Sequence, residues 1–150
     1  MIQPKFLKKI NDEVFYLNNN KIDFAKSIKF VEFKSKLNFR GTVRICFHKN
    51  IDSKLHQMMI CHQNSFNVLP HIHFHKSELC LVLKGSMDVF FYDKYGKKKI
   101  KKKLDFKKNN FLEIPEKTYH SMKVTSKRVI FLETTKGPFN QSDTFYPNWS

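Results

Sequence analysis

The chain has 150 residues, of which 41% are hydrophobic and 15% aromatic, so it is long enough to bury one core and too rich in aromatic residues for a disordered chain. No run approaches the roughly 20 apolar residues that span a bilayer, and the N-terminus lacks the features of a signal peptide, so we expect a soluble cytoplasmic protein. The net charge of +15 suggests nucleic acid, but only three of the 28 basic residues are arginine, the side chain that base recognition favours, so we predict a lysine-rich surface that binds no nucleic acid and attracts anionic small ligands.

The first part of the chain, residues 1–40, has the weakest β signal. Phe24, Ile28 and Val31 recur there at helical spacing, which predicts a helix over residues 23–33. We expect this part to be an N-terminal extension that packs on the remainder of the protein.

Residues 41–136 are expected to form a barrel, and residues 137–150 an extended aromatic tail along it or against a partner chain. Short runs with β propensity are separated by turn residues about every 8–12 positions, which is typical of an all-β sandwich or barrel. The expected strands are residues 42–48, 55–62, 79–83, 87–92, 100–106, 110–114, 120–124 and 129–133.

The run from Glu78 to Leu83 alternates in a way that predicts its two faces. Successive side chains of a strand face opposite sides, so if Glu78 points inward, Cys80 and Val82 follow it and the three leucines point outward. An outward row of leucines needs cover from another element or a second subunit, which predicts a homodimer.

Potential metal ligands concentrate in the segment from His71 to Glu78, which contains three histidines at alternate positions. Such histidines share a face of an extended strand, and imidazole with carboxylate is a ligand set for first-row transition metals. A carboxylate that enters an apolar strand needs a partner, and a metal ion is the simplest one. The residues predict ligation by His73 and Glu78 with His71; His75 either replaces His71 or lies behind the ligands or at the pocket mouth.

The spacing of these residues resembles the first motif of the cupin superfamily, G-x5-H-x-H-x3,4-E-x6-G. His71, His73, Glu78 and Gly85 occupy its positions, and Ser65 stands in place of the first glycine.

The second cupin motif, G-x5-P-x-G-x2-H-x3-N, is matched by Pro115 and His120, whereas Asn109, Lys117 and Val124 replace its other positions. The resemblance implies an all-β fold, the cupin double-stranded β-helix or jelly-roll barrel, preceded here by a short helical segment. It also implies that His120, from a distant strand, completes the ligand set.

Over most of the chain the sequence resembles the WbuC-type cupin metalloproteins, small single-domain cupins found with surface-polysaccharide genes. This resemblance implies one divalent metal ion, such as Zn, Fe, Mn or Ni, and a context of O-antigen or capsule biosynthesis. It is carried by Arg44, His48, residues 70–73, Glu78, residues 81–85, Ile114, Pro115, residues 119–121, residues 136–139, Asp143, Phe145 and Pro147.

The function hypothesised from these features is a metal-dependent isomerase or epimerase of a nucleotide-activated or phosphorylated sugar. The alternatives are a cupin-type metal-dependent dioxygenase and a non-catalytic sugar-binding cupin. His75 and Tyr119 are candidate catalytic groups for proton transfer. Arg44, His48 and Phe66 are candidate substrate contacts, since a guanidinium binds carboxylate or phosphate through paired hydrogen bonds.

Overall fold

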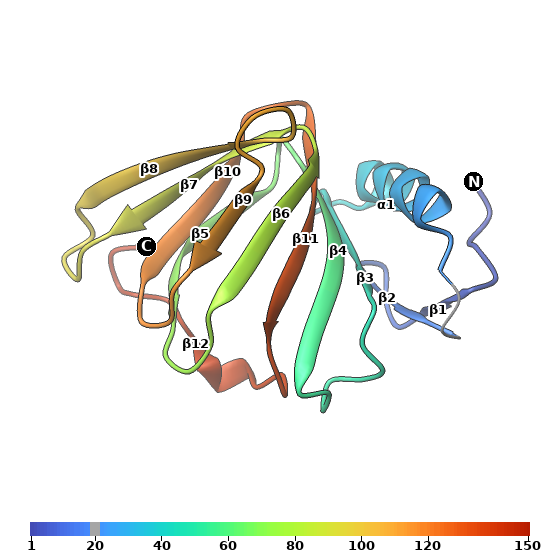
Figure 1. The fold of residues 1–150 in the computed structure, drawn as a ribbon, viewed down its shortest axis with the longest axis horizontal. Helices are drawn as coiled ribbons and strands as arrows, with labels where there is room; N and C mark the ends of the chain where they lie inside the picture. Colours follow the sequence, from blue (N-terminus) through green and yellow to red (C-terminus); the bar gives the residue numbers. More distant parts are fainter. Residues whose placement is uncertain (19–21) are drawn as a thin grey trace.

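The computed structural model describes residues 1–18 and 22–150, whose strands form two facing sheets (Figure 1). The strands are β1 (Leu7–Lys9), β2 (Val14–Leu17), β3 (Thr42–Cys46), β4 (Leu55–Gln63), β5 (Asn67–His73), β6 (Glu78–Lys84), β7 (Ser86–Tyr92), β8 (Lys98–Asp105), β9 (Phe111–Ile114), β10 (Tyr119–Val124), β11 (Arg128–Lys136) and β12 (Thr144–Phe145). The sheet orders are β1-β2-β3-β4-β11-β6-β9 and β12-β5-β10-β7-β8. The all-β prediction is confirmed, and each predicted strand has an observed counterpart; β1, β2, β5 and β12 were not among the predicted strands.

The main core lies between the two sheets and is made by alternate residues of their strands. On β6, Glu78, Cys80 and Val82 are buried, whereas the intervening leucines are partly exposed, as the alternation predicts. Leu83 packs against a second core on the outer side of the larger sheet. The leucine row is therefore covered in part by this chain itself, and the homodimer stays a prediction.

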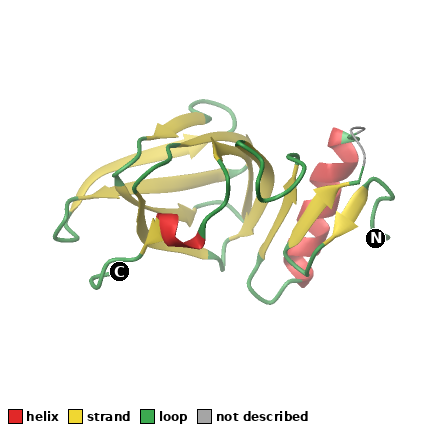
Figure 2. Cartoon of the chain, turned by 90° about the horizontal axis from the view of Figure 1, so that it is seen from below, coloured by secondary structure: helices red, strands yellow, loops and turns green. Residues whose placement is uncertain are grey.

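The N-terminal part extends the larger sheet and covers its outer face with a helix (Figure 2). Helix α1 (Phe24–Leu37) is one turn longer than predicted, and the side chain of Asp23 caps it by accepting from the Lys26 amide. The buried face also differs from the prediction, because Phe24 is 41% exposed whereas Phe30 is fully buried. The ring of Phe30 packs edge-on against Phe15 of β2, with centroids 4.9 Å apart.

The turn between β6 and β7 depends on Gly85, the last glycine of the first cupin-like motif. Its φ is +79°, and a Cβ at this position would collide with the carbonyl oxygen of Arg128. Glycine adopts this left-handed conformation without steric cost, so β6 and β7 can follow one another directly into different sheets.

The C-terminal tail lies along the barrel. After the short 3-10 helix η1 (Gln141–Asp143), β12 pairs with β5. The ring of Trp149 then packs against Tyr92 and Tyr119 and donates a hydrogen bond to the Lys94 carbonyl at 3.2 Å. In the described residues, no helix has the length and apolar character to cross a membrane.

Candidate metal centre

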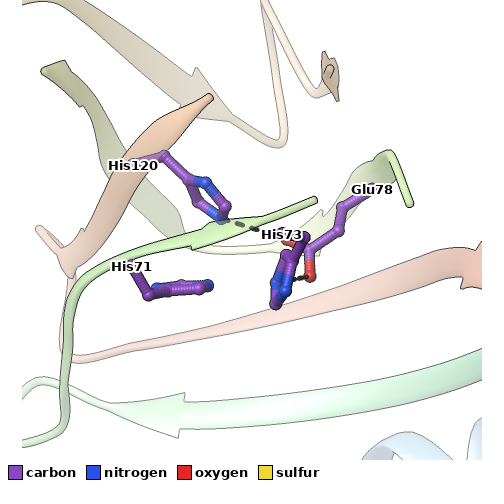
Figure 3. A group of neighbouring side chains, drawn as sticks. All are labelled: His71, His73, Glu78 and His120. Carbon is purple, nitrogen blue, oxygen red and sulfur yellow. Dashed lines mark hydrogen bonds and ion pairs between the residues drawn. The ribbon is translucent and has the colours of Figure 1, made fainter. Parts of the chain in front are cut away.

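Four potential metal ligands from three strands meet inside the barrel (Figure 3). His71 and His73 come from β5, Glu78 from β6 and His120 from β10, where the register places His120 opposite His71. The Nε2 atom of His73 lies 2.8 Å from Oε1 of Glu78, and Nε2 of His120 lies 3.2 Å from Oε2. All four candidate donor atoms lie within 4.8 Å of one another. Donors about 2.0–2.2 Å from one cation have spacings of this order, so the geometry suits a single ion.

The backbone orients each of the three imidazoles. Nδ1 of His71 lies 2.8 Å from the carbonyl oxygen of Leu69, and Nδ1 of His120 lies 2.9 Å from that of Thr118. Nδ1 of His73 lies 3.3 Å from the carbonyl oxygen of Asp143. A proton held on Nδ1 by a carbonyl leaves the Nε2 lone pair free, which is the arrangement common to histidines that bind metals.

Lys117, which replaces a glycine of the second cupin motif, adopts a left-handed backbone conformation that glycine would favour. Its φ is 58°, in the left-handed region that most residues avoid. Its backbone N–H donates to the carbonyl oxygen of His73 at 2.7 Å. The turn before β10 is thereby tied to β5, which fixes the position of His120 relative to His73.

Glu78 and His120 stabilise each other's charged forms, whereas His71 is held neutral. Burial acts to raise the pKa of Glu78, but the hydrogen bonds and charges of His120 and His73 outweigh it and lower that pKa. Burial likewise acts to lower the pKa of His120, and the contact with Glu78 raises it instead. Burial and the neighbouring His120 lower the pKa of His71 to about 4, so His71 is neutral at pH 7 and its lone pair can bind a cation.

The structure brings His71, and not His75, to this cluster. Strand β5 ends at His73, and the chain then bends, so the alternation that would turn His75 toward the other histidines is broken. His75 is exposed. Among the described residues, the cluster thus consists of the four that the cupin motifs indicate.

A cavity of about 390 Å³ reaches this cluster, with His71, His73 and Glu78 in its wall. The cavity is also lined by positively charged side chains from separate parts of the fold. They are Arg40, Arg44, Lys76 and Lys136. Any anionic small molecule that enters would therefore meet cations and the candidate ligands together.

Comparison with family models places this chain in a family. The family model described as "Domain of unknown function (DUF6016)" matches residues 26–104, which is more than half of the chain. The chain belongs to this family. A search of curated proteins found no match.

Solved structures that resemble the chain include cupin-fold proteins. The capsular polysaccharide assembling protein CapF from Staphylococcus aureus aligns with a TM-score of 0.63 at 18% identity over 73% of this chain and 32% of its own. Oxalate decarboxylase from Bacillus subtilis gives 0.52 at 19% identity over 64% and 25%, and the Cnp3 cupin domain of Schizosaccharomyces pombe gives 0.52 at 14% over 63% and 64%. The chain spans about a third of the length of CapF. At these identities the comparison shows the fold, which is the predicted cupin jelly roll.

The other predicted site residues divide between the cavity and its surroundings. Arg44 and Phe66 line the cavity. His48 is not part of the cavity lining. Its ring stacks on that of His56, with centroids 3.9 Å apart, and His56 does line the cavity. Tyr119 precedes the inward-facing His120 on β10 and packs against Trp149 instead. The suggested catalytic roles of His75 and Tyr119 gain no support from these positions.

Three cavity residues were missed by the sequence reasoning, because strand alternation shows only which residues they share a face with. On β4, His56 and His62 share the inward face of the strand, and on β11 Glu133 does so between two buried residues. All three line the cavity. Nδ1 of His62 lies 2.9 Å from the Thr42 hydroxyl, and burial lowers the pKa of His62 to about 3. His62 is therefore a neutral polar group of the cavity wall.

Proposed function

We propose that this chain is a metal-dependent enzyme of the WbuC type that isomerises or epimerises a nucleotide-activated or phosphorylated sugar for surface polysaccharide, such as O-antigen or capsule. The observation that carries the proposal is the buried cluster of three histidines and Glu78 at a cavity lined by cations. The likeness to CapF, a capsular polysaccharide assembling protein, supports the biological context. In this proposal the enzyme acts in the cytoplasm as a homodimer.

The metal ligands in this proposal are His71, His73, Glu78 and His120. Three imidazole nitrogens and one carboxylate oxygen suit Zn, Fe, Mn or Ni, and the Nδ1 contacts of the imidazoles already direct Nε2 toward the centre. Four protein ligands leave a position open on a five- or six-coordinate ion, which is the mark of a catalytic site. When bound, the ion would polarise a carbonyl oxygen of the sugar.

The substrate contacts in this proposal follow from the cavity lining. Arg44 binds the phosphate through the paired N–H groups of its guanidinium, and Lys76 and Lys136 add positive charge. Phe66 and Tyr146 offer aromatic surface to the sugar ring. These groups hold the sugar so that its carbonyl faces the histidine cluster.

The proposal is tested by elemental analysis of the purified protein and by NMR of nucleotide sugars and hexose phosphates incubated with it. We expect one equivalent of a divalent metal per chain and new sugar-ring signals from at least one compound. Absence of stoichiometric metal after incubation with Zn, Fe, Mn and Ni salts would overturn the proposal.

The same donor set is compatible with iron-dependent oxygen chemistry, so a dioxygenase is the second candidate. Consumption of dioxygen by the iron-loaded protein with a small diketone or thiol, without any sugar conversion, would favour it. Calorimetric binding of a nucleotide sugar without any product would instead indicate a sugar-binding cupin.

The C-terminal tail should influence metal affinity through Thr144, whose hydroxyl lies 3.3 Å from Nδ1 of His73. Replacing Thr144 by valine keeps the shape of the side chain and removes this contact, while the Asp143 carbonyl remains. We expect the metal affinity to fall about 10-fold, since outer partners of metal-binding histidines have effects of this size. Thr134→Val, on the outward side of β11, is the matched control. Equal affinities of the two variants, measured by competition with a chelating dye, would contradict the prediction.

A further inference from the structure

Glu133 occupies a position in the barrel that the proposed metal site does not use. Strand β11 lies between β4 and β6, and its register places Glu133 opposite Met58 on one side and Cys80 on the other. Its neighbours on the inward face of β11 are Phe131 and Thr135, both buried. The carboxyl therefore projects from a largely apolar surface into the cavity that also contains Glu78.

The carboxyl of Glu133, which is partly exposed to the cavity, has no partner among the described residues, in contrast to the carboxylates of Glu78 and Glu32. Glu78 contacts two histidines, and Glu32 pairs with Lys84 and Arg128 at 2.8 Å and 3.1 Å. Within residues 1–18 and 22–150, no hydrogen bond or ion pair reaches the side chain of Glu133. Because this carboxyl is partly exposed to the cavity and no protein group contacts it, it is available to a ligand that enters.

The groups that face Glu133 come from several elements. Burial raises its pKa to about 7, and the charge of Glu78 acts in the same direction, whereas Arg44, Lys76 and His120 act to lower it. A cation at the neighbouring histidine cluster would also lower the pKa of Glu133 and favour its carboxylate form. The carboxylate is the form that accepts a proton. The position of Glu133 in the cavity wall and its lack of a protein partner thus suit it to act as a general base.

Resting on the proposed sugar isomerase function, we propose that Glu133 is the catalytic residue that moves a proton between two neighbouring carbons of the substrate. Its carboxylate takes the proton from the carbon next to the sugar carbonyl. The electron pair of the broken C–H bond forms a carbon–carbon double bond, and the π electrons of the carbonyl move to its oxygen. Glu133 then returns the proton to the former carbonyl carbon, while the hydroxyl proton of the second carbon passes to the first oxygen. No oxidant or reductant is needed.

The test uses the metal-loaded protein in heavy water with a panel of aldose and ketose phosphates. Mass spectrometry and NMR measure deuterium incorporated at the carbon next to the carbonyl. We expect Glu133→Gln to slow this exchange about 100-fold or more, the usual range for loss of a general base. Metal content and calorimetric binding of the same sugar phosphates should stay at the level of the unmodified protein. Glu113→Gln, an exposed position on β9, is the matched control and should exchange at the normal rate.

The outcomes separate this inference from the function on which it rests. Exchange by Glu133→Gln at the rate of Glu113→Gln would overturn the role of Glu133 and leave the isomerase intact. Loss of metal or of thermal stability in Glu133→Gln would also overturn it, because an unpartnered base should be dispensable for folding. A metal-loaded unmodified protein that exchanges no proton in any sugar phosphate would overturn the isomerase function and the role of Glu133 together.

Discussion

Replacing either His73 or His120 by alanine is expected to abolish stoichiometric metal binding. Both Nε2 atoms contact the carboxylate of Glu78, at 2.8 Å and 3.2 Å, so each substitution removes one donor and leaves Glu78 with half of its partners. Three candidate donors then remain in place of four, and we expect them to hold the ion too weakly to retain it. Elemental analysis after dialysis against a weak chelator should give well below one equivalent of metal for each variant.

His75→Ala is the matched control for both variants, because His75 belongs to the same segment, is exposed and lies outside the cluster. It should retain the metal content of the unmodified protein. Chelation should lower the thermal stability only modestly, since the barrel has its own apolar core; complete unfolding would identify a structural ion instead. Unchanged metal content in both His73→Ala and His120→Ala would refute the ligand assignment.

The barrel strands could be predicted because their signals are local. Each has a short β-type run bounded by turn residues, and the hydrophobic alternation on β6 correctly gave its buried and outward faces. The N-terminal strands lack such signals. Strand β1 is three residues long, and β2 forms through parallel pairing with β3, a contact between segments far apart in sequence. Neither strand has enough residues of its own to show a period.

The candidate metal site was predictable in part for the same reason. The spacing from His71 to Glu78 lies within one segment, whereas the place of His120 came from the resemblance to cupins. Whether His71 or His75 is the ligand depends on where β5 ends, and the sequence does not mark that end. Glu133 and His62 could not be assigned to the cavity because β11 and β4 have apolar residues on both faces, so alternation does not show which face of these strands is inward.

A substitution of Arg44 is expected to weaken the binding of anionic ligands strongly. Arg44 lines the cavity, and among the described residues its guanidinium has no ion pair, whereas Arg40 pairs with Glu13 and Arg128 with Glu32. A hydrogen bond to a charged group contributes about 1.5–3 kcal/mol. Arg44→Met should therefore weaken the binding of uridine diphosphate or glucose phosphate about 10- to 100-fold by calorimetry.

Arg40→Met provides the comparison that makes this prediction specific. Arg40 lines the same cavity, but its guanidinium lies 3.2 Å from a carboxylate oxygen of Glu13 and its side chain is 53% exposed. A charge that is already paired and hydrated contributes little to a new ligand, so this variant should lose less than about 3-fold in affinity. Equal losses of affinity in the two variants would mean that the anion is attracted only by the general positive charge of the surface and makes no specific contact with Arg44. If the unmodified protein bound neither compound, the prediction that its substrate is anionic would be wrong. The unpaired guanidinium of Arg44, in a cavity also lined by Lys76 and Lys136, should bind a phosphate.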